Sequence, residues 1–181
     1  MKIETERLRL TTWHEEDWVA FRPIATDPEV MHYITGGVPW DDETIRNYVA
    51  RQIALYKTRG FCRWKLIDKT TGDLAGFCGL GFWRDYVGEP EIGWWLGRRF
   101  WGRGLASEAA RAALRDAFLR VRVERVISIA EENNLASIRI MVKLGLTYDG
   151  EMEDQGVKLV RYAIERAAYA GGHQPLPAPI A

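Results

Sequence analysis

The sequence predicts a single domain of the mixed α/β class. Short segments in which apolar and polar residues alternate with a period of two predict strands, and longer segments with apolar residues at helical spacing predict helices. Turn-forming clusters separate several of these segments. With 181 residues, of which 47% are hydrophobic, the chain is long enough for one well-filled core and short for two.

The first half of the chain predicts one strand, two helices and a hairpin. The strand comes first, because Leu8 and Leu10 share one face of an alternating segment. The second helix has Asp41 or Asp42 as its N-cap. A turn cluster between two apolar, alternating segments is the hairpin signal. The strand is expected at residues 3–12, the helices at 15–26 and 41–58, and the hairpin strands at 61–67 and 74–83 around a turn at 68–73.

The second half predicts a short strand, the clearest helix of the chain, and a closing pair of strands. The long helix carries its apolar side chains along one face, and Gly145 closes a shorter helix. Gly and Pro are frequent at the end of the chain, which is typical of a loose tail. The strands are expected at residues 91–96, 126–130, 146–152 and 157–164, the helices at 105–121 and 137–144, the domain at 1–166 and the tail at 167–181.

The composition excludes several functional classes. The formal net charge is zero, so nothing at the level of the whole chain indicates nucleic acid or an anionic membrane as a partner. The first ten residues lack the apolar stretch of a signal peptide, and no run of about 18 apolar residues exists. Cys62 and Cys78 are too few for a disulfide framework, and the three histidines lack metal-ligand spacing. We therefore expect a cytoplasmic protein with two free thiols and no metal.

The segment between Glu91 and Glu108 carries a local excess of positive charge. It contains no acidic residue, yet Arg98, Arg99 and Arg103 lie within it. In a chain of zero net charge, this arrangement favours an anionic ligand.

Two glycines mark the point where this basic segment enters the long helix. Gly102 and Gly104 bracket Arg103, and glycine lets a ligand approach the main chain closely. The first N–H groups of a helix lack internal partners, and the helix dipole favours negative charge there. A pyrophosphate would satisfy both features, with arginines completing the clamp. The alternative is a solvated basic loop before an ordinary helix.

Two other nucleotide-binding patterns compete for the same segment. A dinucleotide-binding interpretation finds a strand, Gly102 and Gly104, a helix, a second strand, and Glu131 as the ribose-binding acid. Ser107, however, replaces its third glycine, and no further strand–helix units complete such a sheet. A phosphate-binding loop of the Walker type is excluded, because no Gly-Lys-Ser/Thr follows.

The segment Arg99–Gly104, with the sequence Arg-Phe-Trp-Gly-Arg-Gly, matches the Arg/Gln-x-x-Gly-x-Gly/Ala signature of the GNAT acetyltransferases. Within that superfamily the chain resembles the ribosomal-protein N-terminal acetyltransferases of the RimJ/RimL type. The resemblance covers residues 3–166, and it departs at Leu146, where the family usually has Phe. The other segments that carry it are residues 5–10, 76–80, 91–96, 134–137 and 143–145.

The resemblance implies a central, mostly antiparallel sheet of about seven strands, flanked by helices, in which two central strands splay apart to admit acetyl-CoA. Backbone groups of Trp95 and Leu96 would pair with the pantetheine arm. Backbone N–H groups from Arg99 to Ala106 would hold the pyrophosphate. This phosphate-binding segment includes Gly102, Arg103, Gly104 and Leu105.

Two further residues follow from the same resemblance. Asn134 would contact the pantetheine or the acetyl end of the coenzyme. Ser137 would lie near the sulfur and protonate the departing thiolate. Each residue has a plainer interpretation, since Asn134 also suits the N-cap of a short helix and Ser137 its first turn.

The expected chemistry is direct attack of an amine on the thioester within a ternary complex, because neither cysteine lies in a recognisable nucleophile setting. The amine must lose a proton before it attacks. Glu91 is the first candidate for the base, directly or through water, and Glu89 and Asp85 have nearly equal claims; the alternative for each is a surface carboxylate. A backbone N–H near Leu96 would stabilise the charge on the carbonyl oxygen.

The sequence leaves the acceptor open. It is a protein N-terminus, as the resemblance suggests, or a small-molecule amine, and Trp13, Trp40 and Trp101 are candidates for lining its cleft. A homodimer is common among such proteins. The rival hypotheses are a non-catalytic acyl-CoA-binding or sensor module on the same fold and, third, a dinucleotide oxidoreductase.

Overall fold

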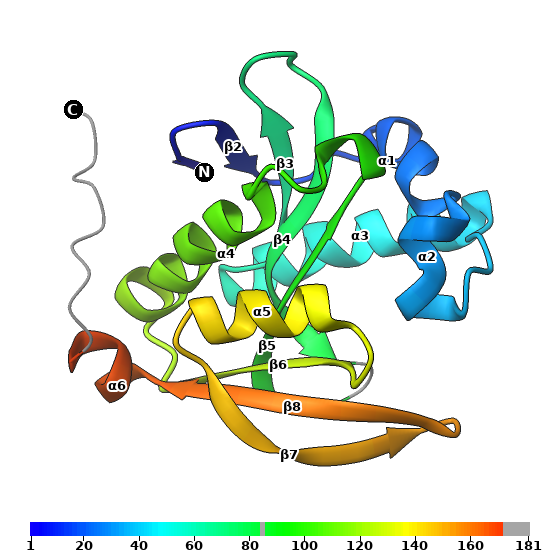
Figure 1. Cartoon of the computed structure of the whole chain (residues 1–181). Coiled ribbons are helices and arrows are strands. Elements are labelled where there is room, and N and C mark those ends of the chain that lie inside the picture. The colour runs from blue at the N-terminus through cyan, green and yellow to red at the C-terminus, as the bar shows by residue number, and fades with distance from the viewer. Residues whose placement is uncertain (84–85, 172–181) are drawn as a thin grey trace.

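One open sheet organises the protein. The computed structural model describes residues 1–83 and 86–171, and its strands follow the order β1-β2-β3-β4-β5-β6-β8-β7 (Figure 1). Every neighbouring pair is antiparallel except β5 and β6. The predicted mixed α/β class and mostly antiparallel sheet are therefore confirmed. The strands are β1 (Lys2–Glu4), β2 (Leu8–Thr11), β3 (Arg63–Asp68), β4 (Leu74–Trp83), β5 (Tyr86–Leu96), β6 (Arg125–Glu131), β7 (Thr147–Asp154) and β8 (Val157–Glu165).

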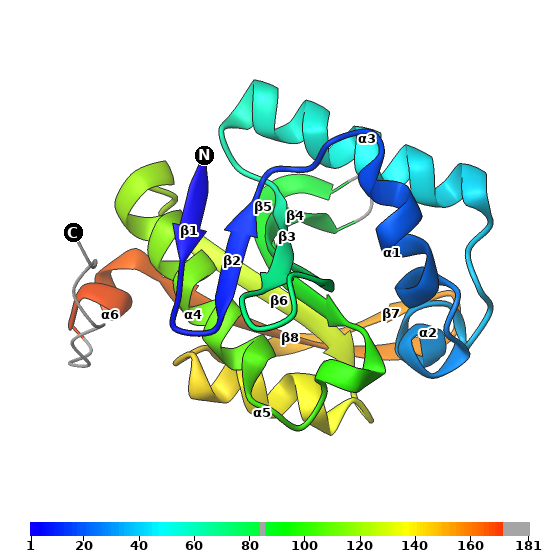
Figure 2. The ribbon, with the colours of Figure 1, turned by 90° about the horizontal axis from the view of Figure 1, so that it is seen from above.

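Helices flank the sheet on both faces. Figure 2 shows α1 and α3, with α2 at their end, on one side of the strands and α4 and α5 on the other. None of the helices within the described residues is both long and apolar enough to cross a membrane. The helices are α1 (Asp17–Ala25), α2 (Pro28–Thr35), α3 (Asp42–Arg59), the 3-10 turn η1 (Arg98–Phe100), α4 (Leu105–Asp116), the π-helical η2 (Ala117–Val121), α5 (Leu135–Lys143) and α6 (Arg166–Gly171).

Helix α2 is not among the predicted elements, although its start is encoded locally. The Asp27 side chain accepts a hydrogen bond from the backbone N–H of Glu29 at 3.0 Å, and Pro28 occupies the first helical position, where its missing N–H costs nothing. Gly36, with a φ of 69°, ends the helix in the left-handed conformation. The helix matters for function because four of its residues, Glu29, Val30, Tyr33 and Ile34, line the cavity described below.

Several boundaries also differ from the predictions. The single strand expected at residues 3–12 is a hairpin of β1 and β2, and β5 begins at Tyr86 rather than Glu91. The long helix is regular only to Asp116 and continues as η2. The first residues of the expected tail form α6, and residues 172–181 lie outside the described residues.

Each face of the sheet has its own core. On the α1–α3 side, Phe21, Tyr48 and Phe77 pack ring against ring, with centroids 5.2–5.9 Å apart. On the α4–α5 side the core is more aliphatic and includes Leu105 and Met141. Both cores anchor the middle strands, so the sheet centre is rigid where the site is built.

The parallel pair β5–β6 opens at the centre of the sheet. In this pair, Glu91 of β5 lies opposite Ile127 of β6. One residue further on, the Oγ of buried Ser128 donates to the backbone carbonyl of Ile92 at 2.9 Å. Beyond that point β5 remains paired with β4 through Leu96, while β6 pairs with β8. The structure therefore has the splayed central strands that the resemblance implies.

Candidate functional site

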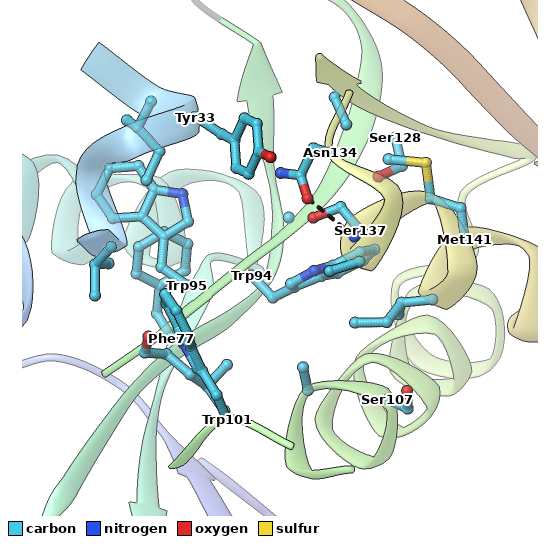
Figure 3. A pocket seen from close by; sticks show the side chains of 18 of the residues that line it. Tyr33, Phe77, Trp94, Trp95, Trp101, Ser107, Ser128, Asn134, Ser137 and Met141 are labelled. Atoms are coloured by element: carbon cyan, nitrogen blue, oxygen red, sulfur yellow. Dashed lines mark hydrogen bonds between the residues drawn. The ribbon is translucent and has the colours of Figure 1, made fainter. Parts of the chain in front are cut away.

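A cavity of about 530 Å³ lies where β5 and β6 separate. It is lined by side chains from α2, β3, β4, β5, β6 and α5 and by the segment that leads from β5 into α4. Figure 3 shows aromatic rings on one side of the cavity and the polar residues at the start of α5 on another. Its volume falls within the range of small-molecule and cofactor sites.

Alternate residues of β5 face opposite sides of the sheet, so the cavity touches both. Trp95 faces the α1–α3 side, where its ring lies 4.9 Å from that of Phe77. Trp94 and Leu96 face the α4–α5 side and pack in the other core. A ligand lying in the gap can thus meet a second ligand that enters from the α1–α3 face.

The register of β4 and β5 decides which backbone groups face the gap. The N–H of Gly97 donates to the carbonyl of Ala75 at 3.0 Å, and bonding alternates along an antiparallel pair. The backbone groups of Trp95 consequently point toward β4, where a Cβ added at Gly76 would overlap its oxygen. Those of Trp94 and Leu96 point into the gap. The backbone groups predicted to face the pantetheine arm were those of Trp95 and Leu96. The register instead directs those of Trp94 and Leu96 into the gap, and Trp95 lines the cavity with its ring.

Trp101 lies against the end of β5. Its indole N–H donates to the carbonyl oxygen of Leu96 at 2.7 Å, while nearly half of its surface remains exposed at the cavity. The Leu96 carbonyl is therefore already bonded, and its N–H together with both backbone groups of Trp94 remain directed into the gap.

The start of α4 is shaped to receive an anion. Gly102 and Gly104 adopt left-handed backbone conformations, with φ of 70° and 75°. The helix begins without a side-chain cap, so its first N–H groups stay available for a ligand. The residues of this segment that line the cavity are Gly102, Gly104, Leu105, Ala106 and Ser107.

The arginines of this segment point elsewhere. Among the described residues that line the cavity, none is one of these three arginines. Each instead forms an ion pair with an aspartate that is distant in sequence, so the local excess of charge is compensated in the fold. The pairs are Arg98–Asp27 at 2.8 Å, Arg99–Asp73 at 2.9 Å and Arg103–Asp68 at 3.3 Å.

Asn134 and Ser137 both line the cavity from the start of α5. Asn134 is the N-cap, because its Oδ1 accepts a hydrogen bond from the backbone N–H of Ser137 at 3.1 Å. Figure 3 shows this bond as a dashed line and places both side chains beside the gap. Asn134 therefore caps α5, and the same residue still lines the cavity.

Tyr33 reaches the same region from α2, which sequence reasoning missed. Its hydroxyl donates to the backbone carbonyl of Asn133 at 3.4 Å, and Figure 3 shows its ring extending toward Asn134. The cavity is therefore bordered by a contact between α2 and the loop before α5.

Glu91 lies deep in the cavity, with 5% of its surface exposed, and forms an ion pair with Arg63 of β3. Burial disfavours a charged guanidinium, but the Glu91 carboxylate and the Tyr48 hydroxyl together outweigh it and raise the pKa of Arg63. Glu89 instead pairs with Arg125 at 2.6 Å, away from the lining residues. Asp85 lies outside the described residues. Of the two candidate bases that the structure describes, Glu91 is the one in the cavity.

Both thiols are unsuited to nucleophilic catalysis. Cys62 and Cys78 are free and buried; burial raises the pKa of Cys62 to about 12 and that of Cys78 further. Within residues 1–83 and 86–171, no group of three or more His, Cys, Asp or Glu side chains could hold a metal ion.

Comparison with known proteins agrees with this arrangement. The acetyltransferase (GNAT) domain matches residues 7–147. YnaD of Bacillus subtilis (strain 168), named as an uncharacterized N-acetyltransferase, is 31% identical over 152 residues, which cover 83% of this chain and 85% of that protein.

Solved structures show the same fold. A GNAT-family acetyltransferase from Bacillus anthracis superposes with a TM-score of 0.78 at 27% identity, covering 92% of this chain and 99% of that one. RimL, a ribosomal L7/L12 alpha-N-protein acetyltransferase in complex with coenzyme A, has a TM-score of 0.78 at 20% identity, covering 93% and 99%. The family match, the N-acetyltransferase relative and the splayed strands together show that this chain is an N-acetyltransferase of the GNAT family.

Proposed function

We propose that this protein transfers the acetyl group of acetyl-CoA to a primary amine by direct attack in a ternary complex. One observation carries the proposal: a single cavity runs through the splayed strands, with an uncapped helix start at one end and the Glu91 carboxylate on the opposite face of β5. Donor and acceptor can therefore meet in the plane of the sheet.

The residues at the gap fit the coenzyme. The first N–H groups of α4 and the left-handed Gly102 and Gly104 suit a pyrophosphate. The backbone groups of Trp94 and Leu96 that face the gap suit the amides of a pantetheine arm. In this proposal Arg99 and Arg103 support the segment through their ion pairs, or exchange those partners for phosphate oxygens when the coenzyme binds.

Glu91 and Ser137 would handle the protons. Glu91 accepts the first proton from the incoming ammonium and passes it to solvent. As the new N–C bond forms and the C–S bond breaks, Ser137 delivers its proton to the departing thiolate, and the second proton of the nitrogen passes through water to restore the Ser137 hydroxyl. A backbone N–H of the Leu96 region donates to the carbonyl oxygen while it is negatively charged. The products are an N-acetylated amine, the free coenzyme thiol and one proton.

The nature of the amine is part of the proposal. The name of RimL supports a protein N-terminus as one acceptor class, although at 20% identity it shows the fold alone. The cavity, with aromatic walls and the carboxylates of Glu29, Glu91 and Glu131 in its lining, also accommodates a small-molecule amine. We place the reaction in the cytoplasm, because both cysteines are free thiols.

Two measurements test the proposal. Calorimetry with acetyl-CoA should show binding, and a thiol-release assay over peptides with different N-termini and small amines should show acetyl transfer. Binding without thiol release for any amine would instead favour the non-catalytic acyl-CoA-binding module. Binding of NAD without binding of coenzyme A would support a dinucleotide enzyme.

A further inference from the structure

The Arg63 guanidinium occupies a prepared place on the acceptor face of the sheet. Its neighbours on β4 and β5 are glycines, and a Cβ added at Gly81 or Gly93 would lie 3.1 or 3.3 Å from its Nε. The main chain of Arg63 is held from two sides. Its N–H donates to Gln52 Oε1 at 3.0 Å, and the indole N–H of Trp13 donates to its carbonyl at 2.6 Å. The cation is therefore fixed in position by its surroundings.

This guanidinium has donors to spare. A guanidinium carries five N–H groups, and Nη2 donates to Glu91. The Tyr48 hydroxyl also faces the guanidinium as an acceptor, and it is buried with no other partner among the described residues. Arg63 nevertheless lines the cavity, and 17% of its side chain is exposed there. Because Glu91 and Tyr48 cannot use all five N–H groups, donors remain for a ligand on the side where Arg63 borders the cavity.

The charged residues that line the cavity are one cation, Arg63, and three carboxylates, Glu29, Glu91 and Glu131. Glu91 neutralises Arg63 at the cavity floor, while Glu29 lies at the exposed rim on α2. The walls beside the pair are the rings of Phe77 and Trp95, and the Phe77 centroid lies 5.9 Å from Arg63 Cζ. The floor thus offers one cation and one anion side by side within apolar walls.

We propose that Arg63 selects an acceptor whose amine lies next to a carboxylate, as in a free amino acid with an apolar or aromatic side chain. This inference rests on the proposed function. The planar fork of a guanidinium binds a carboxylate through two parallel hydrogen bonds, and it does so best where water is excluded. A zwitterionic acceptor would set its carboxylate on Arg63 and its ammonium beside Glu91, matching both charges.

The exchange of partners also serves the chemistry. An acceptor carboxylate on Arg63 would take over the cation that Glu91 holds in the free protein. The Glu91 carboxylate, no longer bonded to Arg63 Nη2, would then face the ammonium of the acceptor. A polyamine would instead bring a second positive charge toward Arg63, and the first residue of a peptide carries an amide where the carboxylate should be.

The first test compares acceptors on the unchanged protein. Thiol release is measured with phenylalanine, phenylalaninamide and phenethylamine, and with the corresponding leucine series, at equal concentrations of unprotonated amine. We expect kcat/KM for the free amino acids to exceed that of their carboxylate-free partners by about tenfold or more. Equal or faster release from the carboxylate-free amines would overturn the inference and leave the proposed function intact. Binding of acetyl-CoA with no release from any amine, peptide or polyamine would overturn both.

Variants locate the preference at Arg63. Arg63→Lys keeps the charge but loses the fork, and the double variant Arg63→Gln/Glu91→Gln removes both charges together, so no buried charge is left unpaired. In both variants, the ratio of kcat/KM for a free amino acid to kcat/KM for its carboxylate-free partner should fall toward one. The acetyl-CoA affinity measured by calorimetry should stay within twofold. Arg51→Gln is the matched control, because Arg51 is an exposed arginine of α3 beside the same aromatic cluster. A preference that survives in Arg63→Lys would contradict the assignment, and the comparison on the unchanged protein decides the case if a variant does not fold.

Discussion

Replacing Ser128 by alanine should weaken the point at which β5 and β6 separate. The Ser128 hydroxyl is 2% exposed and donates to the Ile92 carbonyl at 2.9 Å. Its loss would leave that buried carbonyl without its donor, which costs about 2 kcal/mol. For a chain of this size each kcal/mol shifts Tm by about 3 °C, so we expect a fall of about 6 °C. Because the bond sits at the vertex of the gap, KM for acetyl-CoA should also rise.

Thermal unfolding with and without saturating coenzyme A, together with thiol-release kinetics, measures both effects. Ser107→Ala is the matched control, because Ser107 also lines the cavity but its hydroxyl has no hydrogen bond among the interactions of the described residues. Its Tm should change by less than about 1 °C. A Tm for Ser128→Ala equal to that of the unaltered protein would refute the idea that this bond holds the vertex.

Three further predictions concern the base, the sheet and the thiols. Glu91→Gln should lower turnover by about a hundredfold while leaving the calorimetric affinity for acetyl-CoA unchanged; full turnover would exclude Glu91 from the mechanism. Gly76→Ala should destabilise by more than about 3 kcal/mol in urea unfolding, because the added Cβ overlaps Trp95 O and lies 2.9 Å from Leu96 Cα. Gly72→Ala, at a left-handed φ of 77° with nothing near the added Cβ, should lose only about 1 kcal/mol. The pKa of Cys62 is raised to about 12 in the fold, so the stability that the buried neutral thiol contributes is complete below the unfolded value near 9 and is lost as pH rises toward 12. The free energy of unfolding should therefore decline between pH 9 and pH 12, with a shallower slope in Cys62→Ala. Identical slopes would contradict the burial argument.

Local patterns predicted the elements whose signals are contained in a few neighbouring residues. The apolar stripe of 105–121 gave the helix, and the alternation near Phe61 and Leu74 gave the hairpin strands β3 and β4. Helix α2 was not predicted, although Asp27 and Pro28 form a start signal, because its apolar spacing extends over only eight residues. Tyr33 was missed with it.

The parts of the site that depend on distant pairs could not be predicted from one sequence. Nothing local in the chain connects Arg63 with Glu91, and their ion pair exists only because β3, β4 and β5 align with Gly81 and Gly93 beneath the guanidinium. The direction of the Trp94 and Trp95 backbone groups likewise depends on the register with β4, which a one-residue shift would reverse. The capping bond of Asn134, in contrast, is local, and both interpretations of that residue were open from the sequence.

The structure changes the reason for expecting phosphate binding at residues 99–106. Its arginines suggested an anion, yet Arg99 and Arg103 are paired with Asp73 and Asp68. The groups of this segment that face the cavity include the backbone of the left-handed glycines and the uncapped start of α4, and none of its arginine side chains. A motif made of glycines at fixed spacing identifies such a site from sequence because the requirement lies on backbone conformation, which glycine satisfies at those positions. The acceptor face has no comparable motif, since its selectivity depends on side chains that the sheet brings together from three strands.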